Sequence, residues 1–217
     1  MNLALGSSVR CADGPFGELA DVLVDPVSNR VTHLVVRSAG LDGVPRLVPI
    51  ALAGAPGGEQ KEIVLQCTLS AAAELEPVQS HDFLRPGDPP PDDPEWDVGA
   101  EWMLAAPIGS LGLAPYEGVD ASYDVVYDRI PKGEAEIRRA SVVIGPNGRY
   151  VGDINGFVLD ITEQITHVVI EHGFLWRRRK VAIPIDSVES VQTDTVTLRL
   201  NDYEVDALPS ERVHRWF

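Results

Sequence analysis

The stretch Ile165-Thr166-His167-Val168-Val169-Ile170 has an earlier counterpart in Val31-Thr32-His33-Leu34-Val35-Val36. Both stretches are rich in β-branched and aliphatic residues, a composition typical of β-strands. A segment that recurs within a chain of 217 residues indicates an internal duplication. We therefore predict two copies of one β-rich unit.

The similarity extends to both sides of these stretches. Each stretch follows a glycine and a hydrophobic run that ends in aspartate, and each precedes an apolar-Pro-apolar triplet. The recurring residues are Gly17 and Gly152, Asp25 and Asp160, His33 and His167, and Pro49 and Pro184. Proline within a strand pattern indicates an edge or bulge position, because it lacks a ladder donor. We interpret all eight as structural residues of the repeated unit.

Turn signals separate short strand-like runs in both copies. Asp13-Gly14 and Asn147-Gly148 are tight-turn dipeptides, since glycine readily adopts positive φ. Alternating apolar residues over 62–69 and 195–200 predict one further strand in each copy, and residues 70–75 predict a single helical turn. Short strands at such regular intervals are typical of small barrels or sandwiches. We expect an all-β chain with two small antiparallel barrels, over residues 1–77 and 137–217.

The segment between the copies, residues 78–136, has a different composition. Residues 77–136 hold 9 of the 17 prolines, and their 3 basic and 13 acidic side chains supply −10 of the net charge of −15. Proline-rich segments tend to be extended. Two tryptophans and three tyrosines are nevertheless unusual for a free linker. We expect an irregular connector that packs its aromatic side chains on one or both barrels.

The sequence as a whole shows none of the usual marks of an enzyme or a membrane protein. It contains no GxSxG motif and no glycine-rich phosphate loop. No apolar run approaches the roughly 20 residues that span a bilayer, and the N-terminus lacks the features of a signal peptide. The acidic net charge disfavours general nucleic-acid binding. We expect a cytoplasmic, non-enzymatic protein without a cofactor, a catalytic residue or a metal site.

The two cysteines, Cys11 and Cys67, both lie in the first copy and lack the spacing of a metal site. We interpret them as small buried hydrophobic residues, with an isolated disulfide as the alternative. His33 and His167 are interpreted as half-buried residues that bond a nearby carboxylate, with Asp25 and Asp160 as candidates. The alternative is a pair of pH-sensitive groups or ligands.

The ordered set of glycine, aspartate, histidine and proline motifs resembles the PRC-barrel domain family. That family includes the cytoplasmic part of the photosynthetic reaction-centre H subunit and the C-terminal domain of a ribosome-maturation factor. The resemblance covers residues 5–77 and 137–209, and the second copy is similar to tandem PRC-barrel proteins of actinobacterium-like genomes. It implies small, curved antiparallel barrels that serve protein contacts and assembly. The chain departs from both named relatives, because it lacks the transmembrane helix of the first and the additional barrel of the second.

Two features near the end of the chain are candidates for partner binding. Trp176-Arg177-Arg178-Arg179-Lys180 places four consecutive cations beside a tryptophan, and Trp216-Phe217 ends the chain with two aromatic residues. The cations suit an acidic partner, a phosphate or RNA. Alternatively, they form a plain surface or pair with acidic residues of the connector. The terminal aromatic residues dock either on this chain or on a partner. The acidic residues considered are Asp92, Asp93, Glu95 and Asp97.

The sequence favours an adaptor or assembly module that contacts protein partners. An RNA- or ribosome-associated factor that uses Arg177–Lys180 is the first alternative. A carrier or enzyme with a small-molecule pocket between the barrels is the second. We expect the chain to form an internal pseudo-dimer or a homodimer, since duplicated domains often reproduce an ancestral two-fold contact.

Overall fold

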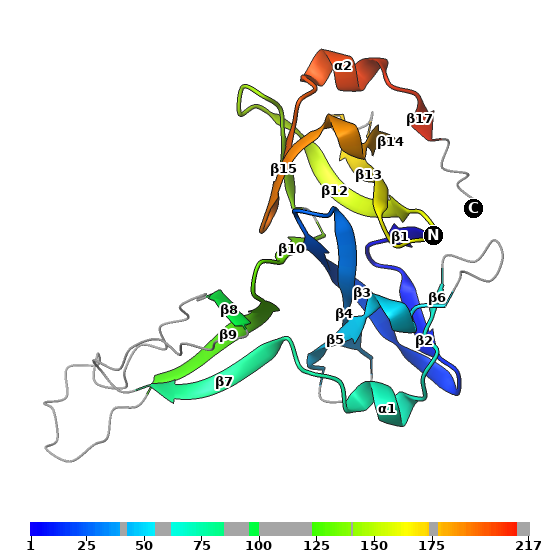
Figure 1. Cartoon of the computed structure of the whole chain (residues 1–217), viewed down its shortest axis with the longest axis vertical. Coiled ribbons are helices and arrows are strands. Elements are labelled where there is room, and N and C mark those ends of the chain that lie inside the picture. The colour runs from blue at the N-terminus through cyan, green and yellow to red at the C-terminus, as the bar shows by residue number, and fades with distance from the viewer. Residues whose placement is uncertain are drawn as a thin grey trace, which may run out of the picture. The chain divides into compact units, whose positions relative to one another are not determined.

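The chain divides into two units in a computed structural model that describes residues 1–39, 43–54, 62–84, 96–99, 123–139, 141–173 and 178–211 (Figure 1). The larger unit joins Met1–Glu76 to Gly133–Phe217, and the smaller unit is Pro77–Lys132. The two sequence copies thus belong to one unit, although a separate segment divides them along the chain.

The larger unit contains two sheets. The N-terminal sheet has the strand order β5-β4-β3-β2-β6, and β10 also pairs with β3. Its strands are β2 (Ser8–Cys11), β3 (Gly14–Asp25), β4 (Arg30–Ser38), β5 (Pro45–Pro49), β6 (Ile63–Val64) and β10 (Ala135–Arg138). The short helices η1 (Ile50–Leu52) and α1 (Leu69–Ala73) follow β5 and β6.

The C-terminal sheet repeats this order and extends it. Its path is β15-β16-β11-β12-β13-β14-β17, and β1 also pairs with β12. Its strands are β1 (Asn2–Ala4), β11 (Val142–Ile144), β12 (Tyr150–Leu159), β13 (Ile165–His172), β14 (Arg179–Pro184), β15 (Val188–Gln192), β16 (Thr195–Leu198) and β17 (Ser210–Glu211). The helices η4 (Ile185–Ser187) and α2 (Asp202–Ala207) correspond to η1 and α1.

Each half of the chain supplies a strand to the sheet of the other half. Strand β1 precedes the N-terminal sheet but pairs with β12, where Leu3 lies opposite Phe157. Strand β10 precedes the C-terminal sheet but pairs with β3, where Ile137 lies opposite Val22. Both exchanged strands run antiparallel to their partners. Figure 1 shows β1 beside β12 and β10 beside β3.

A second reciprocal contact joins the turn after β3 to the turn after β12. The Ile165 N–H donates to the Asn29 carbonyl at 2.9 Å, and the Val31 N–H donates to the Glu163 carbonyl at 3.3 Å. Asn29 and Glu163 both have positive φ, 54° and 66°. Because Val31 and Ile165 begin the two repeated stretches, the two bonds are equivalent, and the contact has approximate two-fold symmetry.

The buried side chains of both sheets form one hydrophobic core. Leu3 and Ile137, from the exchanged strands, are completely buried. Strands β3 and β12 each carry two register irregularities at matching places, next to Leu19 and Ile154 and near the strand ends. Bulges of this kind increase strand bending and twist. They let both sheets curve around the shared core.

Gly17 and Gly152 stand where two backbones approach closely. A Cβ atom at Gly17 would collide with the carbonyl of Arg37, and one at Gly152 would lie 2.5 Å from the carbonyl of Glu171. Gly156 has a similar place under β1, because a Cβ there would collide with the carbonyl of Leu3. Glycine is therefore required at these three positions, where the neighbouring backbone leaves no room for a side chain.

The smaller unit contains a three-stranded sheet, with the order β7-β9-β8. Its strands are β7 (Gln79–Leu84), β8 (Trp96–Gly99) and β9 (Tyr123–Pro131). The expectation of a wholly irregular connector is therefore wrong, because antiparallel pairing organises both ends of the segment. Its packing on the rest of the chain stays a prediction.

The expected all-β class is confirmed, whereas two closed barrels are not. Within the described ranges, no strand pairing closes either sheet on itself. The strand predicted over 62–69 is too long, since β6 ends at Val64 and α1 begins at Leu69. The Thr68 hydroxyl accepts a hydrogen bond from the Ala71 N–H and caps this helix. A helix cap thus replaces the end of the predicted strand.

Replacing either exchanged-strand residue, by Leu3→Ala or Ile137→Ala, should lower the free energy of unfolding by about 2–5 kcal/mol, since each leaves a cavity in the shared core. Urea unfolding followed by circular dichroism measures the loss. Val142→Ala on β11, where the side chain is 40% exposed, is the control and should cost less than about 1 kcal/mol. An unchanged urea midpoint for Leu3→Ala would contradict the exchange of β1.

Candidate functional site

The eight recurring motif residues occupy equivalent structural positions. Pro49 and Pro184 end β5 and β14 and precede η1 and η4, with φ of −55° and −57°. His33 lies opposite Pro49 across the ladder, and His167 lies opposite Pro184. The repeated pattern therefore maintains a strand-to-helix corner in each sheet.

Asp25 and Asp160 hold the turns that meet at the approximate two-fold axis. Asp25 accepts hydrogen bonds from the Val27 N–H at 2.9 Å and the Ser28 hydroxyl at 2.6 Å. The Thr162 hydroxyl and N–H both donate to Asp160 at 2.7 Å. These bonds, with the Ser28 hydroxyl and the Thr162 hydroxyl as the largest causes, lower the pKa of both carboxyl groups below the usual range. Both aspartates thus have a turn-forming role.

The two histidines have partners other than these aspartates. The Nδ1 atom of His33 lies 3.5 Å from a carboxylate oxygen of Glu134, just before β10. The Nδ1 atom of His167 lies 3.1 Å from the Thr166 hydroxyl. The expected bonds to Asp25 and Asp160 are therefore wrong, because those carboxylates are engaged by their own turns. Both imidazoles are half-buried, as expected.

Within the predicted basic patch, Arg179 is bound to its own chain. Its guanidinium donates to the carbonyls of Leu208 at 3.1 Å, Val205 at 3.2 Å and Asp206 at 2.7 Å. It also donates to the Asp206 carboxylate at 3.1 Å. Carbonyls at the end of a helix lack intrahelical donors, so Arg179 caps α2 and fastens it to β14.

A second contact of α2 comes from His172, which the sequence analysis did not single out. The residue is only 4% exposed. Its Nδ1 lies 2.6 Å from the Val151 carbonyl, and its Nε2 lies 3.1 Å from Asp206 Oδ1. Both ring nitrogens therefore face oxygen atoms of other segments. His172 and Arg179 together explain an aspartate near the C-terminal end of α2, where the helix dipole disfavours negative charge.

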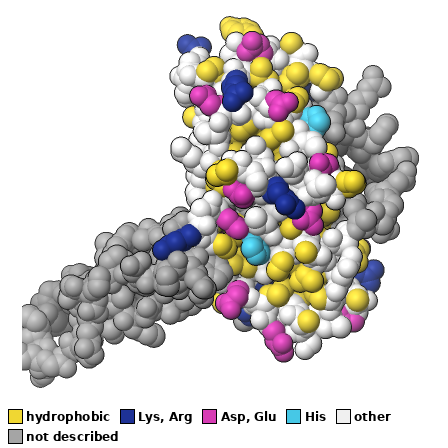
Figure 2. Space-filling view, viewed as in Figure 1, with side chains coloured by type: hydrophobic (Ala, Val, Ile, Leu, Met, Phe, Trp, Pro, Cys, Tyr) yellow, Lys and Arg dark blue, Asp and Glu magenta, His cyan; other side chains and the backbone are white. Residues whose placement is uncertain are grey.

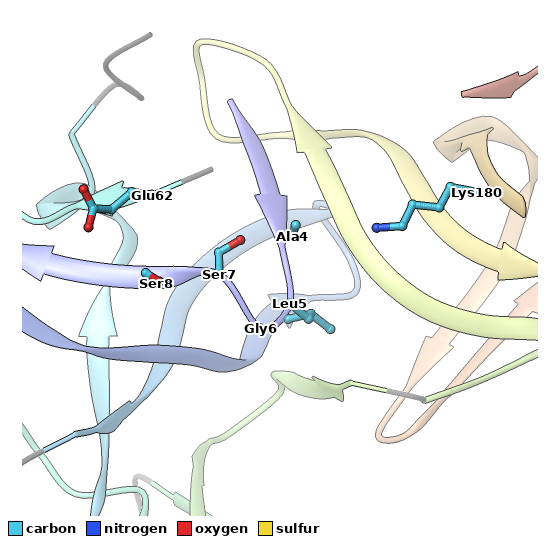
Figure 3. A pocket seen from close by; sticks show the side chains of 7 residues that line it. All are labelled: Ala4, Leu5, Gly6, Ser7, Ser8, Glu62 and Lys180. Carbon is cyan, nitrogen blue, oxygen red and sulfur yellow. The ribbon is translucent and has the colours of Figure 1, made fainter. Parts of the chain in front are cut away.

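The other predicted patch residues have different surroundings. Arg178 is half-exposed and lies 3.8 Å from Glu171. Lys180 reaches from β14 toward the segment after β1, across an open recess of about 590 Å³ whose opposite side carries Glu62 (Figure 3). Ser7 and Ser8 also line this recess. Four predicted partner-binding residues lie outside the described residues: Trp176, Arg177, Trp216 and Phe217. The acidic side chains considered as connector partners of the patch are likewise not described.

Two exposed aliphatic residues, which the sequence analysis missed, lie on the turns that meet at the two-fold contact. Val27 is 91% exposed and Ile161 is fully exposed. Each stands two residues before the positive-φ residue of its turn, Asn29 or Glu163. Arg30 ties the turns together by donating to the Thr162 carbonyl at 3.0 Å. The sequence signal was an aliphatic residue shortly after each repeated aspartate.

Other types of site find little support in the described part of the chain. No group of three or more His, Cys, Asp or Glu side chains there could hold a metal ion. No helix in the same ranges is long and apolar enough to span a bilayer.

Comparison with known families identifies part of the chain. Residues 135–204 match the family model of the PRC-barrel domain. This segment runs from β10 into α2 and includes the stretch Ile165–Ile170. No curated protein matches the chain. The family expected for the second copy is therefore supported, whereas the same assignment for residues 1–77 stays a prediction.

Arg179→Ala should lower the free energy of unfolding by about 1–3 kcal/mol, because several carbonyls lose a charged donor. It should also accelerate amide hydrogen exchange in α2. Arg178→Ala is the matched control, since an exposed ion pair contributes little, and it should stay within about 0.5 kcal/mol of the wild type. Equal effects of the two variants on α2 exchange would contradict the assigned role of Arg179.

The hydrogen bond from His172, followed by attraction to His172 and Arg179, lowers the pKa of Asp206 below its usual range. The charged carboxylate therefore stabilises the fold above its ordinary pKa, and this contribution disappears as the pH falls through the lowered value. Melting temperatures from pH 5 to about pH 2 should fall less steeply for Asp206→Asn than for the wild type. The slope for Asp206→Asn is compared with that for Asp202→Asn. The second variant removes another carboxylate near the same nitrogen, since Asp202 lies 3.8 Å from His172 Nε2. Identical slopes for Asp206→Asn and the wild type would contradict this linkage.

Proposed function

We propose that the chain is a non-enzymatic, cytoplasmic tandem PRC-barrel protein that acts as an adaptor or assembly module. The observation that carries this proposal is the match of residues 135–204 to the PRC-barrel domain, a domain associated with protein contacts. The same strand order and the reciprocal β1 and β10 pairings support a second PRC-type copy in the N-terminal half. The internal arrangement is that of a pseudo-dimer.

The paired turns at the two-fold contact provide the best-defined surface for a protein partner. Val27 and Ile161 are exposed at corresponding places, and the hydrogen bonds between their turns hold both segments in position. A backbone that hydrogen bonds already hold in position loses less entropy on binding than a mobile loop does. On the face shown in Figure 2, hydrophobic side chains lie among charged ones, as is usual on protein surfaces.

An RNA- or ribosome-associated role has less support from the described patch residues. Arg179 makes several contacts with α2, and Arg178 lies near Glu171. RNA binding would require Arg179 to exchange these contacts for phosphate. The small-molecule alternative is favoured by one observation, the open recess lined by Lys180 and Glu62. Two opposite charges with nearby serine hydroxyls suit a small polar ligand, and a ligand retained through purification is the corresponding test.

The adaptor proposal is tested by affinity capture from the native cell followed by mass spectrometry. The double variant Val27→Asp/Ile161→Asp should reduce capture of the principal partner at least about tenfold, because each change places a charge in an apolar contact. Its melting temperature should stay close to that of the wild type, since both side chains are exposed. The matched control is Tyr203→Asp, which changes an exposed aromatic residue on α2 and should retain the partner.

Two outcomes would count against the proposal. Full retention of the partner by the double variant would exclude the paired turns as the contact surface. Saturable turnover of a small molecule, abolished by one point substitution, would contradict the non-enzymatic function itself.

A further inference from the structure

The two cysteines of the chain meet in the N-terminal sheet. Cys11 is the last residue of β2, and Cys67 immediately precedes Thr68, the N-cap of α1. Their Sγ atoms lie 4.0 Å apart, although the residues are 56 positions apart in the sequence. Both are free thiols; Cys11 is buried, whereas Cys67 is partly exposed. The fold thus brings together one protected thiol and one accessible thiol.

Backbone contacts on both sides of the pair hold the two segments together. The Ala12 N–H donates to the Cys67 carbonyl at 2.9 Å. The Leu69 N–H donates to the Asp13 carboxylate at 2.8 Å. A disulfide requires a sulfur separation of about 2 Å and neighbouring backbones. Because the backbones are already adjacent, side-chain rotation with a small local adjustment closes the remaining distance.

The C-terminal sheet shows that this place in the fold does not require cysteine. Val9 pairs with Gly17 and Ile63 as Val143 pairs with Gly152 and Val196. Cys11 lies two residues after Val9, as Gly145 lies two after Val143. Cys67 lies four residues after Ile63, as Leu200 lies four after Val196. A glycine and a leucine thus fill the equivalent corner. Packing alone therefore does not account for two facing thiols in the N-terminal sheet.

We propose that Cys11 and Cys67 are a reversible oxidation site that forms an intramolecular disulfide with a small-molecule disulfide as the oxidant. The cross-link fastens the corner before α1 to β2. The stability of the N-terminal sheet then depends on the thiol–disulfide balance around the protein. This site is independent of the proposed adaptor function, because neither cysteine belongs to the paired turns.

Exposure sets the order of the two chemical steps. The Cys67 thiolate attacks one sulfur of oxidised glutathione, so that a mixed disulfide forms and one glutathione thiolate leaves. Cys11 then loses its proton to solvent and attacks the Cys67 sulfur, which releases the second glutathione thiolate. Two protein thiols are oxidised and one glutathione disulfide is reduced. Burial, reinforced by the neighbouring Cys67, raises the pKa of Cys11 to about 12, which makes the buried thiol unsuited to the first attack.

The test uses the purified, fully reduced chain incubated with oxidised glutathione, followed by alkylation of remaining thiols and intact mass analysis. The expected product has lost two hydrogens, carries no alkyl group and no glutathione, and returns to the dithiol with excess reduced glutathione. Its melting temperature should rise by roughly 5–10 °C, because the cross-link restricts the unfolded chain. A stable glutathione adduct, an intermolecular dimer or unreacted thiols as the end product would overturn the proposal.

Two variants separate the roles of the thiols. Cys11→Ala should accumulate glutathione on Cys67, because the resolving thiol is absent. Cys67→Ser should leave Cys11 unmodified under the same conditions, because that thiol is buried. Rapid glutathionylation of Cys11 in folded Cys67→Ser would contradict the order of attack. The wild-type mass result decides the proposal even if Cys11→Ala fails to fold.

Discussion

The exchange of β1 and β10 is the interaction on which the larger unit depends. Strands β3 and β12 are longer than their hairpin partners β2 and β11, so part of each strand edge needs another strand. Unpaired backbone groups beside a buried core are costly. The leading strand of each half supplies the missing partners and contributes Leu3 or Ile137 to the core. Neither half of the sequence contains all strands of its own sheet.

This arrangement explains why the repeated motif residues are structural. Glycine permits the close approach of neighbouring strands, aspartate organises the turns, and proline ends the strand before the short helix. The differences between the halves carry the candidate functions. Arg179 and His172 secure α2 in the C-terminal half, and the facing thiols occur in the N-terminal half. Each half carries one exposed aliphatic residue on its turn, Val27 or Ile161, so the two-fold contact presents a pair of apolar side chains.

The sequence predicted the fold better than the site. Alternation and turn dipeptides located most strands, because those signals depend on neighbouring residues. It predicted the wrong histidine partners, since Glu134 reaches His33 only through the exchange of β10. It recognised the charge of Arg177–Lys180 but not the capping role of Arg179. That role depends on α2, which lies more than twenty residues later in the chain and approaches β14 only in the folded protein.

The sequence by itself determined the all-β class, the recurring motif and the positions of glycine, aspartate and proline within that motif. These features follow from local conformational preferences and from periodicity. Only the tertiary structure decided which half completes each sheet, because strand pairing between distant segments leaves no local pattern. It likewise decided that Cys11 faces Cys67 and that Val27 and Ile161 stand on joined turns. Side chains far apart in sequence become neighbours only when the two sheets close around one core.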